Sequence, residues 1–164
     1  MSARRPSIAV AAATLAILGA GCSTAESPSD VSTTQMTTKW VAAPSGKFLL
    51  QGQILQKYLD AGGSTSSLGS PISNEKPAPG NGRFTLFEAG AIYWTPQTGA
   101  HVVAGNIRNT WEFDHGGPAG PLGYPTSDAH SAPGGPQQRF QHGTINDSAD
   151  GHTHVEFSPP AAGS

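Results

Sequence analysis

Hydrophobic residues in this chain follow a helical period and then a strand period. Between residues 53 and 61 the apolar positions lie at i, i+1, i+4 and i+5, which places them on one face of a helix. They are Ile54, Leu55, Tyr58 and Leu59. Gly62 then supplies a residue type that commonly ends helices. Strand-like runs follow at 83–87, 91–94 and 101–104, so the pattern predicts a short helix followed by an antiparallel hairpin.

The same pattern occurs a second time. A helical stripe at 106–115 contains Ile107 and Trp111, and strand-like runs follow at 139–145 and 153–157. Ile54 and Ile107 are 53 positions apart, and so are Phe87 and Phe140. We expect Trp111, Phe87 and Phe140 to lie in the core. Tandem repeats of this kind normally cover one another's hydrophobic faces.

Each copy carries the motif LG-x-P-x-S between its helix and its strands, at 68–73 and at 122–127. The second copy has one extra residue before the motif and one fewer after it. Segment 46–52 matches 99–105, again 53 positions apart. The repeats therefore begin with the last strand of an earlier, partial copy, in which Trp40 stands for Tyr93 or Trp94.

This reading divides the chain into four parts and predicts an α+β fold. About two tandem repeats, each a short helix, an LG-x-P turn and a small antiparallel hairpin, pack as one compact domain at 39–158. Within it we place a partial repeat at 39–53, repeat one at 54–106 and repeat two at 107–158. The other parts are a signal peptide at 1–21, a tether at 22–38 and a disordered tail at 159–164.

The N-terminus has the composition of an export signal. Arg4 and Arg5 precede an apolar run at 8–20, which is about half the length of a membrane-spanning helix. Small residues lead to Cys22, the only cysteine, in an order that resembles a bacterial lipobox. We expect the Cys22 thiol to be lipidated. The alternative is cleavage between Ala20 and Gly21, which would leave an unmodified secreted protein.

The amino-acid composition and charge limit the kinds of partner that the protein can be expected to bind. Residues 23–38 are rich in Ser and Thr and nearly devoid of apolar side chains, which predicts a flexible tether. Removal of 1–21 would leave 143 residues with seven Lys or Arg and eleven Asp or Glu. No run of positive charge is present, so a nucleic-acid partner is not expected. Membrane attachment would come from acyl chains.

The repeated segments resemble LGFP repeats, which recur in exported proteins of mycolic-acid-producing actinobacteria. The resemblance covers 46 to about 157 and is strongest at 87–94 and 99–103. In this family the repeats are often attached to mycolyltransferases or peptidoglycan-acting enzymes and are thought to hold them to wall polysaccharide. Ser70 and Tyr124 replace the Phe of the family signature. The resemblance implies a wall-binding module without an attached enzyme.

Six residues are candidates for ligand binding, because aromatic rings can stack on sugars while guanidinium and carboxylate groups can bond their hydroxyls. They are Tyr93, Trp94, Tyr124, Arg83, Arg139 and Glu88. Adjacent strand residues point to opposite faces, so one of Tyr93 and Trp94 should be core and the other exposed. Repeat two has Asn146 and Asp147 at their positions, which predicts a weaker second site.

Metal binding and catalysis have little support. His142, Asp147, Asp150, His152 and His154 are close enough in sequence to hold zinc. However, His101 matches His154 at the repeat spacing, and a packing or hydrogen-bonding role explains that position more simply. No nucleophile elbow or HExxH motif is present, and the spacing of Glu88 and Glu112 does not support a glycosidase pair. We expect no metal, no cofactor and no enzymatic activity.

The sequence thus predicts a lipoprotein on the outer face of the cell membrane. Its repeats would bind wall polysaccharide, with arabinogalactan as the expected glycan, and so bridge membrane and wall. The alternative is a protein-interaction module that docks another exported envelope protein. The oligomeric state is left open.

Overall fold

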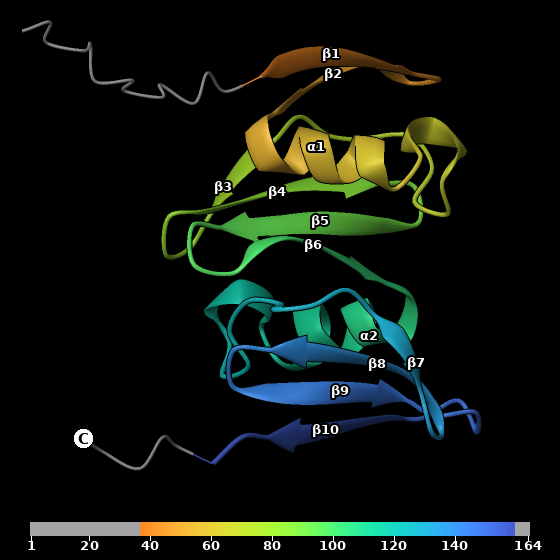
Figure 1. Ribbon diagram of the computed structural model, residues 1–164, viewed down its shortest axis with the longest axis vertical. Coiled ribbons are helices and arrows are strands. Elements are labelled where there is room, and N and C mark those ends of the chain that lie inside the picture. The colour runs from red at the N-terminus through yellow and green to blue at the C-terminus, as the bar shows by residue number, and fades with distance from the viewer. Residues whose placement is uncertain (1–36, 160–164) are drawn as a thin grey trace, which may run out of the picture. The chain divides into compact units, whose positions relative to one another are not determined.

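The computed structural model describes residues 37–159 (Figure 1). They belong to one compact unit, Gln35–Ser164. The expected signal segment, the expected lipidation site Cys22, most of the expected tether and the tail beyond Pro159 lie outside the described residues. Within 37–159, no helix combines the length and apolar character needed to cross a bilayer.

Residues 37–159 form three antiparallel sheets separated by helical segments (Figure 1). The first sheet is a hairpin of β1 (Thr38–Ala43) and β2 (Gly46–Gln51). Helix α1 (Gly52–Asp60) and a short turn η1 (Gly63–Thr65) follow it. The middle sheet has the order β3-β4-β5-β6, and its strands are Lys76–Ala78, Gly82–Phe87, Gly90–Thr95 and Gly99–Ala104.

The second helical segment consists of α2 (Gly105–Asn109), a π-helical turn η2 (Thr110–Asp114) and a 3₁₀ turn η3 (Gly117–Ala119). The last sheet has the order β10-β9-β8-β7. In chain order its strands are His130–Ala132, Gly135–Phe140, Gly143–Asp147 and Thr153–Phe157. Helix α1 contacts the first and middle sheets, and α2 contacts β6 and β9, so helical layers alternate with sheets.

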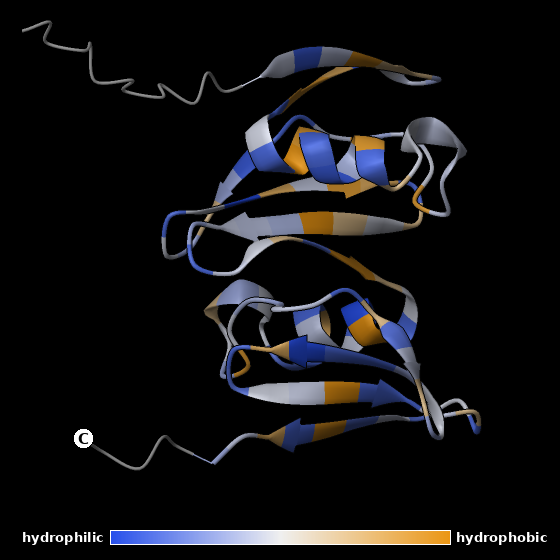
Figure 2. Ribbon diagram, viewed as in Figure 1, coloured by the Kyte–Doolittle hydropathy of each residue, from blue (hydrophilic) through white to orange (hydrophobic). Residues whose placement is uncertain are grey.

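The middle sheet is packed on both faces, because successive side chains of a strand point to opposite sides. Ile92 belongs to the core around α1, together with Leu50 and Tyr58. Its neighbour Tyr93 belongs to the core around α2 and η2, together with Trp111. Figure 2 shows apolar positions on the helices and along the strands that flank them. As expected, Trp111, Phe87 and Phe140 are buried.

The α+β class and the tandem arrangement are confirmed, but each full repeat carries a four-stranded sheet instead of a single hairpin. Strands β3 and β7 could not be predicted from the sequence, because they are only three residues long and begin or end in Pro/Gly-rich turns. Proline is tolerated at sheet edges, where β3 lies. The predicted strand at 139–145 is also wrong, since it is divided between β8 and β9 by a two-residue turn.

The extra residue of the second copy is accommodated in its helix. In the first copy, the Ala61 N–H donates to the Lys57 carbonyl, four residues back, at 3.0 Å. In the second copy, the His115 N–H donates to the Thr110 carbonyl, five residues back, at 3.1 Å. A π-helical turn holds one more residue per hydrogen-bonded turn than an α-helix does. The repeats therefore remain aligned on both sides of the insertion.

The first sheet covers α1, as the partial-repeat reading predicts. The position assigned to Trp40 is wrong, however. Trp40 pairs with Leu49 in the hairpin, and the equivalent pair in the middle sheet is Ile92 and Val102. Trp40 therefore stands for Ile92, not for Tyr93 or Trp94. The sequence match fixed β2 but could not fix the register of the unmatched strand beside it.

Candidate functional site

The LG-x-P turn of repeat one is held by a glutamate from the β4–β5 turn. Gly69 has a left-handed backbone, with φ of 73°. A Cβ atom at Gly69 would overlap the Glu88 carboxylate, so this position requires glycine. The Ser70 N–H donates to Glu88 Oε2 at 2.9 Å. Glu88, a predicted ligand contact, thus fastens this turn.

Repeat two builds the same turn with an amide. Gly123 has φ of 67°, and a Cβ there would overlap the Gln141 side chain. The Tyr124 N–H donates to Gln141 Oε1 at 2.8 Å. Because the amide oxygen is occupied, its NH₂ group is the half that a ligand can use. Gln141 is itself exposed.

The side chain at position x of the second motif crosses to the preceding repeat. The Tyr124 hydroxyl donates to the Pro79 carbonyl in the β3–β4 turn. Its ring lies against Gly82, where any Cβ would overlap it. Tyr124 is 5 % exposed, and burial raises the pKa of its hydroxyl. This ring is therefore mainly a contact between repeats, and only a small part of it is left to meet a ligand.

A pocket of about 410 Å³ opens beside Tyr124, where the two repeats meet; we call it the junction pocket. Repeat one contributes its β3–β4 and β5–β6 turns, and repeat two contributes η3, the LG-x-P turn and the β8–β9 turn. The lining residues are Pro79, Gly80, Thr95, Gln97, Pro118, Tyr124 and Gln141. None of them is charged. Proline and tyrosine surfaces stand beside amide groups, which suits an uncharged ligand with apolar faces and hydroxyl groups.

The β5–β6 turn that carries Gln97 is internally braced. Thr95 Oγ1 accepts the Thr98 N–H at 3.0 Å, and the two threonine hydroxyls lie 2.9 Å apart. His101 Nε2 donates to the Thr98 carbonyl at 2.8 Å. Gln97 is exposed at the tip of this fixed turn. Its amide is therefore presented to the pocket by a rigid frame.

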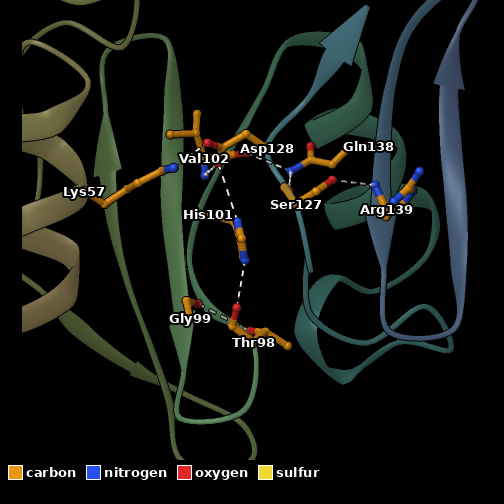
Figure 3. A network of polar contacts seen from close by, with 9 residues as sticks. All are labelled: Lys57, Thr98, Gly99, His101, Val102, Ser127, Asp128, Gln138 and Arg139. Atoms are coloured by element: carbon orange, nitrogen blue, oxygen red, sulfur yellow. Dashed lines mark hydrogen bonds and ion pairs between the residues drawn. The ribbon is translucent and has the colours of Figure 1, made fainter. Parts of the chain in front are cut away.

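A polar network fastens the repeats to each other next to the pocket (Figure 3). Asp128 Oδ1 accepts the Val102 N–H at 2.9 Å, and Oδ2 pairs with Lys57 Nζ from α1. His101 Nδ1 lies 3.6 Å from Oδ1. Burial opposes the charge on Asp128, but hydrogen bonds from His101, Lys57 and the Val102 N–H outweigh it and hold its pKa well below the usual range.

Buried Gln138 completes this network. Its Nε2 donates to the Val102 carbonyl at 2.7 Å and to the Ser127 carbonyl at 2.8 Å. Val102 thus has both its N–H and its carbonyl satisfied from repeat two. The same joint exists one repeat earlier, where Asn74 Oδ1 accepts the Leu49 N–H at 2.8 Å. The residue after LG-x-P-x-S is therefore a fastener in both copies.

Tyr93 is in the core, so its expected role as a ligand platform is contradicted. It is 2 % exposed, and its ring meets Trp111 edge-on with 4.7 Å between centroids. Its hydroxyl donates to Glu112 Oε1 at 3.0 Å, and Arg108 Nε donates to Glu112 Oε2 at 2.6 Å. Burial and then the Glu112 charge raise the pKa of Tyr93. Trp94 points to the opposite face of the middle sheet and is half-buried against the core around α1.

The other predicted residues do not gather into one site. Arg83 lies opposite Trp94 across β4 and β5, so these two are brought together. Arg83 Nε also pairs with the buried carboxylate of Glu75, which accepts the Gln51 N–H through its other oxygen. Arg139 is exposed on the last sheet. Of the six candidates, only Tyr124 lines the junction pocket.

Sequence reasoning missed Gln97, Gln141, Pro79 and Pro118, because the junction pocket exists only where two repeats touch. The sequence did contain one signal, at position x of the LG-x-P motif. This position is the bulky Tyr124 in the second copy, which follows a full repeat, and the small Ser70 in the first copy, which does not.

The alternative chemistries gain no geometric support. Within 37–159, no three His, Cys, Asp or Glu side chains come together as metal ligands would. Glu88 is engaged by Ser70, while Glu112 is engaged by Tyr93 and Arg108. Neither glutamate lines the junction pocket.

Comparison with known proteins identifies the repeats. The model of the LGFP repeat matches two consecutive segments, 68–120 and 122–156, which together make up more than half of the chain. Both segments begin at an LG-x-P motif, and the first ends just after η3. A search of curated proteins found no match. The chain belongs to the LGFP-repeat family.

Proposed function

We propose that this protein is a cell-envelope lipoprotein that binds cell-wall polysaccharide, with arabinogalactan as the glycan, at the junction pocket. Acyl chains on Cys22 would hold the chain to the membrane, and the tether would let the repeats reach the wall. The observation that carries the proposal is the uncharged lining of the pocket, which combines two amides with two prolines and a tyrosine.

The lining fits a neutral sugar chain in three respects. The volume of the pocket lies within the range of roughly 300–1,000 Å³ that is usual for small-ligand sites. The absence of charge among the lining residues disfavours an anionic or cationic ligand, which would lose hydration without gaining an ion pair. The Gln97 and Gln141 amides offer donors and acceptors to hydroxyl groups.

A pull-down with isolated wall arabinogalactan at near-physiological salt tests the proposal. The purified protein should be retained, and Gln97→Ala should weaken retention about fivefold through the loss of one or two hydrogen bonds. Gln53→Ala is the matched control, because Gln53 is an exposed glutamine on α1 that does not line the pocket. Absence of retention would refute glycan binding. Equal retention of the Gln97→Ala protein would move the site away from the pocket.

Lipid anchoring has a separate test in cells. Cys22→Ala should release the protein from membranes into the medium, because no acyl chain could then be attached. Unchanged membrane retention would defeat this part of the proposal.

A protein partner is the second candidate, and one observation favours it. Phe113, in the π-helical turn, is 74 % exposed, and Phe157 on β10 is 53 % exposed. The Phe157 and His115 rings meet edge-on with 6.1 Å between centroids. Exposed aromatic groups are common anchors at protein interfaces. Crosslinking in intact cells followed by mass spectrometry would yield adducts with another exported protein in that case.

A further inference from the structure

The outer face of the first sheet presents an apolar surface. Its inner face packs against α1 through Leu50, with Val41 and Phe48 at the edge of the same core. Trp40 and Leu49 form a pair on the opposite face. In the middle sheet, the equivalent pair Ile92 and Val102 packs in the core around α1. Trp40 is instead 60 % exposed.

Positive charge accompanies this apolar surface. Residues 37–53 contain Lys39 and Lys47 and no Asp or Glu, although the whole chain has a formal charge of −2. Lys47 pairs with Ala42 on the same face as Trp40, whereas Lys39 pairs with Leu50 and so projects from the face that packs against α1. Both lysines are exposed, and neither has an ion-pair partner among residues 37–159. Three other basic residues, Lys57, Arg83 and Arg108, are paired with carboxylates.

We propose that this face, made of Trp40, Leu49 and Lys47, docks on an anionic lipid bilayer. Tryptophan favours the boundary between headgroups and acyl chains, and lysine favours the negative surface potential of anionic lipids. The charge complementarity selects this occupant over a neutral glycan. The proposal rests in part on the proposed anchor at Cys22, which precedes Thr37 by 15 residues and so brings the first sheet to the bilayer.

Because the proposed anchor would hold the chain near the membrane, a weak contact between the docking face and the lipids is sufficient for docking. Each lysine near an anionic surface strengthens binding about fivefold, which alone gives only modest affinity. The expected tether would raise the effective concentration of the docking face at the bilayer to about the millimolar range. Docking by the first sheet would leave the last sheet, at the other end of the repeat order, free for the wall.

Vesicle binding by an unacylated protein tests the docking face independently of the anchor. The chain from residue 22 onward carries Cys22→Ser and retains the whole compact unit Gln35–Ser164. It is mixed at low salt with vesicles of phosphatidylglycerol and phosphatidylcholine in equal parts, or of phosphatidylcholine alone. Sedimentation measures the partition coefficient. Tryptophan fluorescence reports insertion, because Trp111 is buried and Trp94 half-buried, whereas Trp40 is exposed.

We expect binding to the anionic vesicles with a blue shift of the emission, and much weaker binding to phosphatidylcholine. Trp40→Ser should lower the partition coefficient about tenfold, and Lys47→Ser about fivefold. The matched controls are Phe113→Ser, which removes another exposed aromatic ring, and Lys76→Ser, which removes an exposed lysine elsewhere. Both controls should bind as the parent does. Circular dichroism verifies that each variant is folded.

Three results would overturn the docking proposal: no binding to anionic vesicles, equal binding to both vesicle types, or equal loss in the controls. Loss of arabinogalactan retention on Trp40→Ser, with vesicle binding unchanged, would assign the face to the glycan instead. None of these results depends on acylation, so failure here is distinct from failure of the Cys22→Ala release test.

Discussion

The middle and last sheets are built from the same type of repeat, but they differ in burial. The middle sheet is buried on both faces, whereas the last sheet is buried on only one face. Tyr93 and Val103 of the middle sheet are buried against the second helical segment. Their counterparts, 53 positions later, are Asn146 and Glu156, which are half-buried and exposed. Terminal repeats need a polar outer face to remain soluble. The change from Tyr93 to Asn146 therefore fits a face that no helical segment of residues 37–159 covers, and the weaker second sugar site that it suggested is not needed to explain it.

The two joints between repeats, made by Asn74 and Asp128, also differ from each other. Asn74 fastens repeat one to the first sheet with a neutral hydrogen bond. Asp128 fastens repeat two to the middle sheet with the equivalent bond and adds an ion pair with Lys57. Position x is Ser70 at the first joint and Tyr124 at the second. Within 37–159 the first sheet has no counterpart of the β3–β4 turn, so a tyrosine there would have no such turn to reach.

Exchanging side chains between the middle and last sheets should give the largest effect. Tyr93→Asn would leave a cavity beside Trp111 and bury an amide, and it should lower the free energy of unfolding by about 3–5 kcal/mol. Asn146→Tyr, the reverse change on the outer face, removes the hydrogen bond that Asn146 Oδ1 accepts from the Gln137 amide and should lower it by only about 1 kcal/mol. Urea unfolding measures both. Equal losses would contradict the view that the last sheet is an end cap.

Truncation at position x should have the next largest effect. Tyr124→Ala removes a buried ring and its bond to Pro79, and it should lower the free energy of unfolding by about 3 kcal/mol. Tyr124→Phe removes only the hydroxyl bond and should cost about 1 kcal/mol. Ser70→Ala is the matched change in repeat one and should be nearly neutral. A comparable loss for Ser70→Ala would show that position x does not act as a contact between repeats.

The ion pair at the second joint should make the free energy of unfolding depend on pH, and this effect should be the smallest of the three predictions. Because the pKa of Asp128 is lowered by folding, its stabilisation is present above the unfolded value of about 3.9 and is lost as pH falls below it. The Asp128 side chain is 43 % exposed, so solvent screening limits the contribution to about 1 kcal/mol.

Asp128→Asn copies the neutral joint at Asn74 and is the matched variant. Its deficit in free energy of unfolding, relative to the parent, should be largest near neutral pH and should shrink below about pH 4. High salt should also reduce the deficit at neutral pH. Urea unfolding at several pH values measures it. A deficit that stays constant with pH would indicate that the ion pair contributes nothing to the joint.

Periodicity and the repeat spacing were sufficient to predict the helical segments, the strands β4, β5, β6 and β10, and the core aromatic residues Trp111, Phe87 and Phe140. These features follow from local patterns in the sequence. The spacing also revealed that β2 belongs to a partial repeat. It did not place Trp40, because a strand without a sequence match can slip by one residue and expose its other face.

The junction pocket could not be predicted from single residues. Gln97 and Gln141 lie in turns of different repeats, and they share a pocket only because Tyr124 and Asp128 fix one repeat against the other. Tyr93 was misjudged for a related reason. An aromatic residue next to Trp94 resembles a sugar platform in sequence, but the helical segment of the following repeat covers it.

Amide chemical shifts of the isotope-labelled protein during titration with wall arabinogalactan would test the central claim most directly. Binding at the junction pocket predicts that the largest shifts occur at Gly80, Gln97 and Gln141, while Trp40 and Phe113 remain unchanged. Absence of shifts at saturating glycan, or shifts confined to the surface around Phe113 and Phe157, would contradict it.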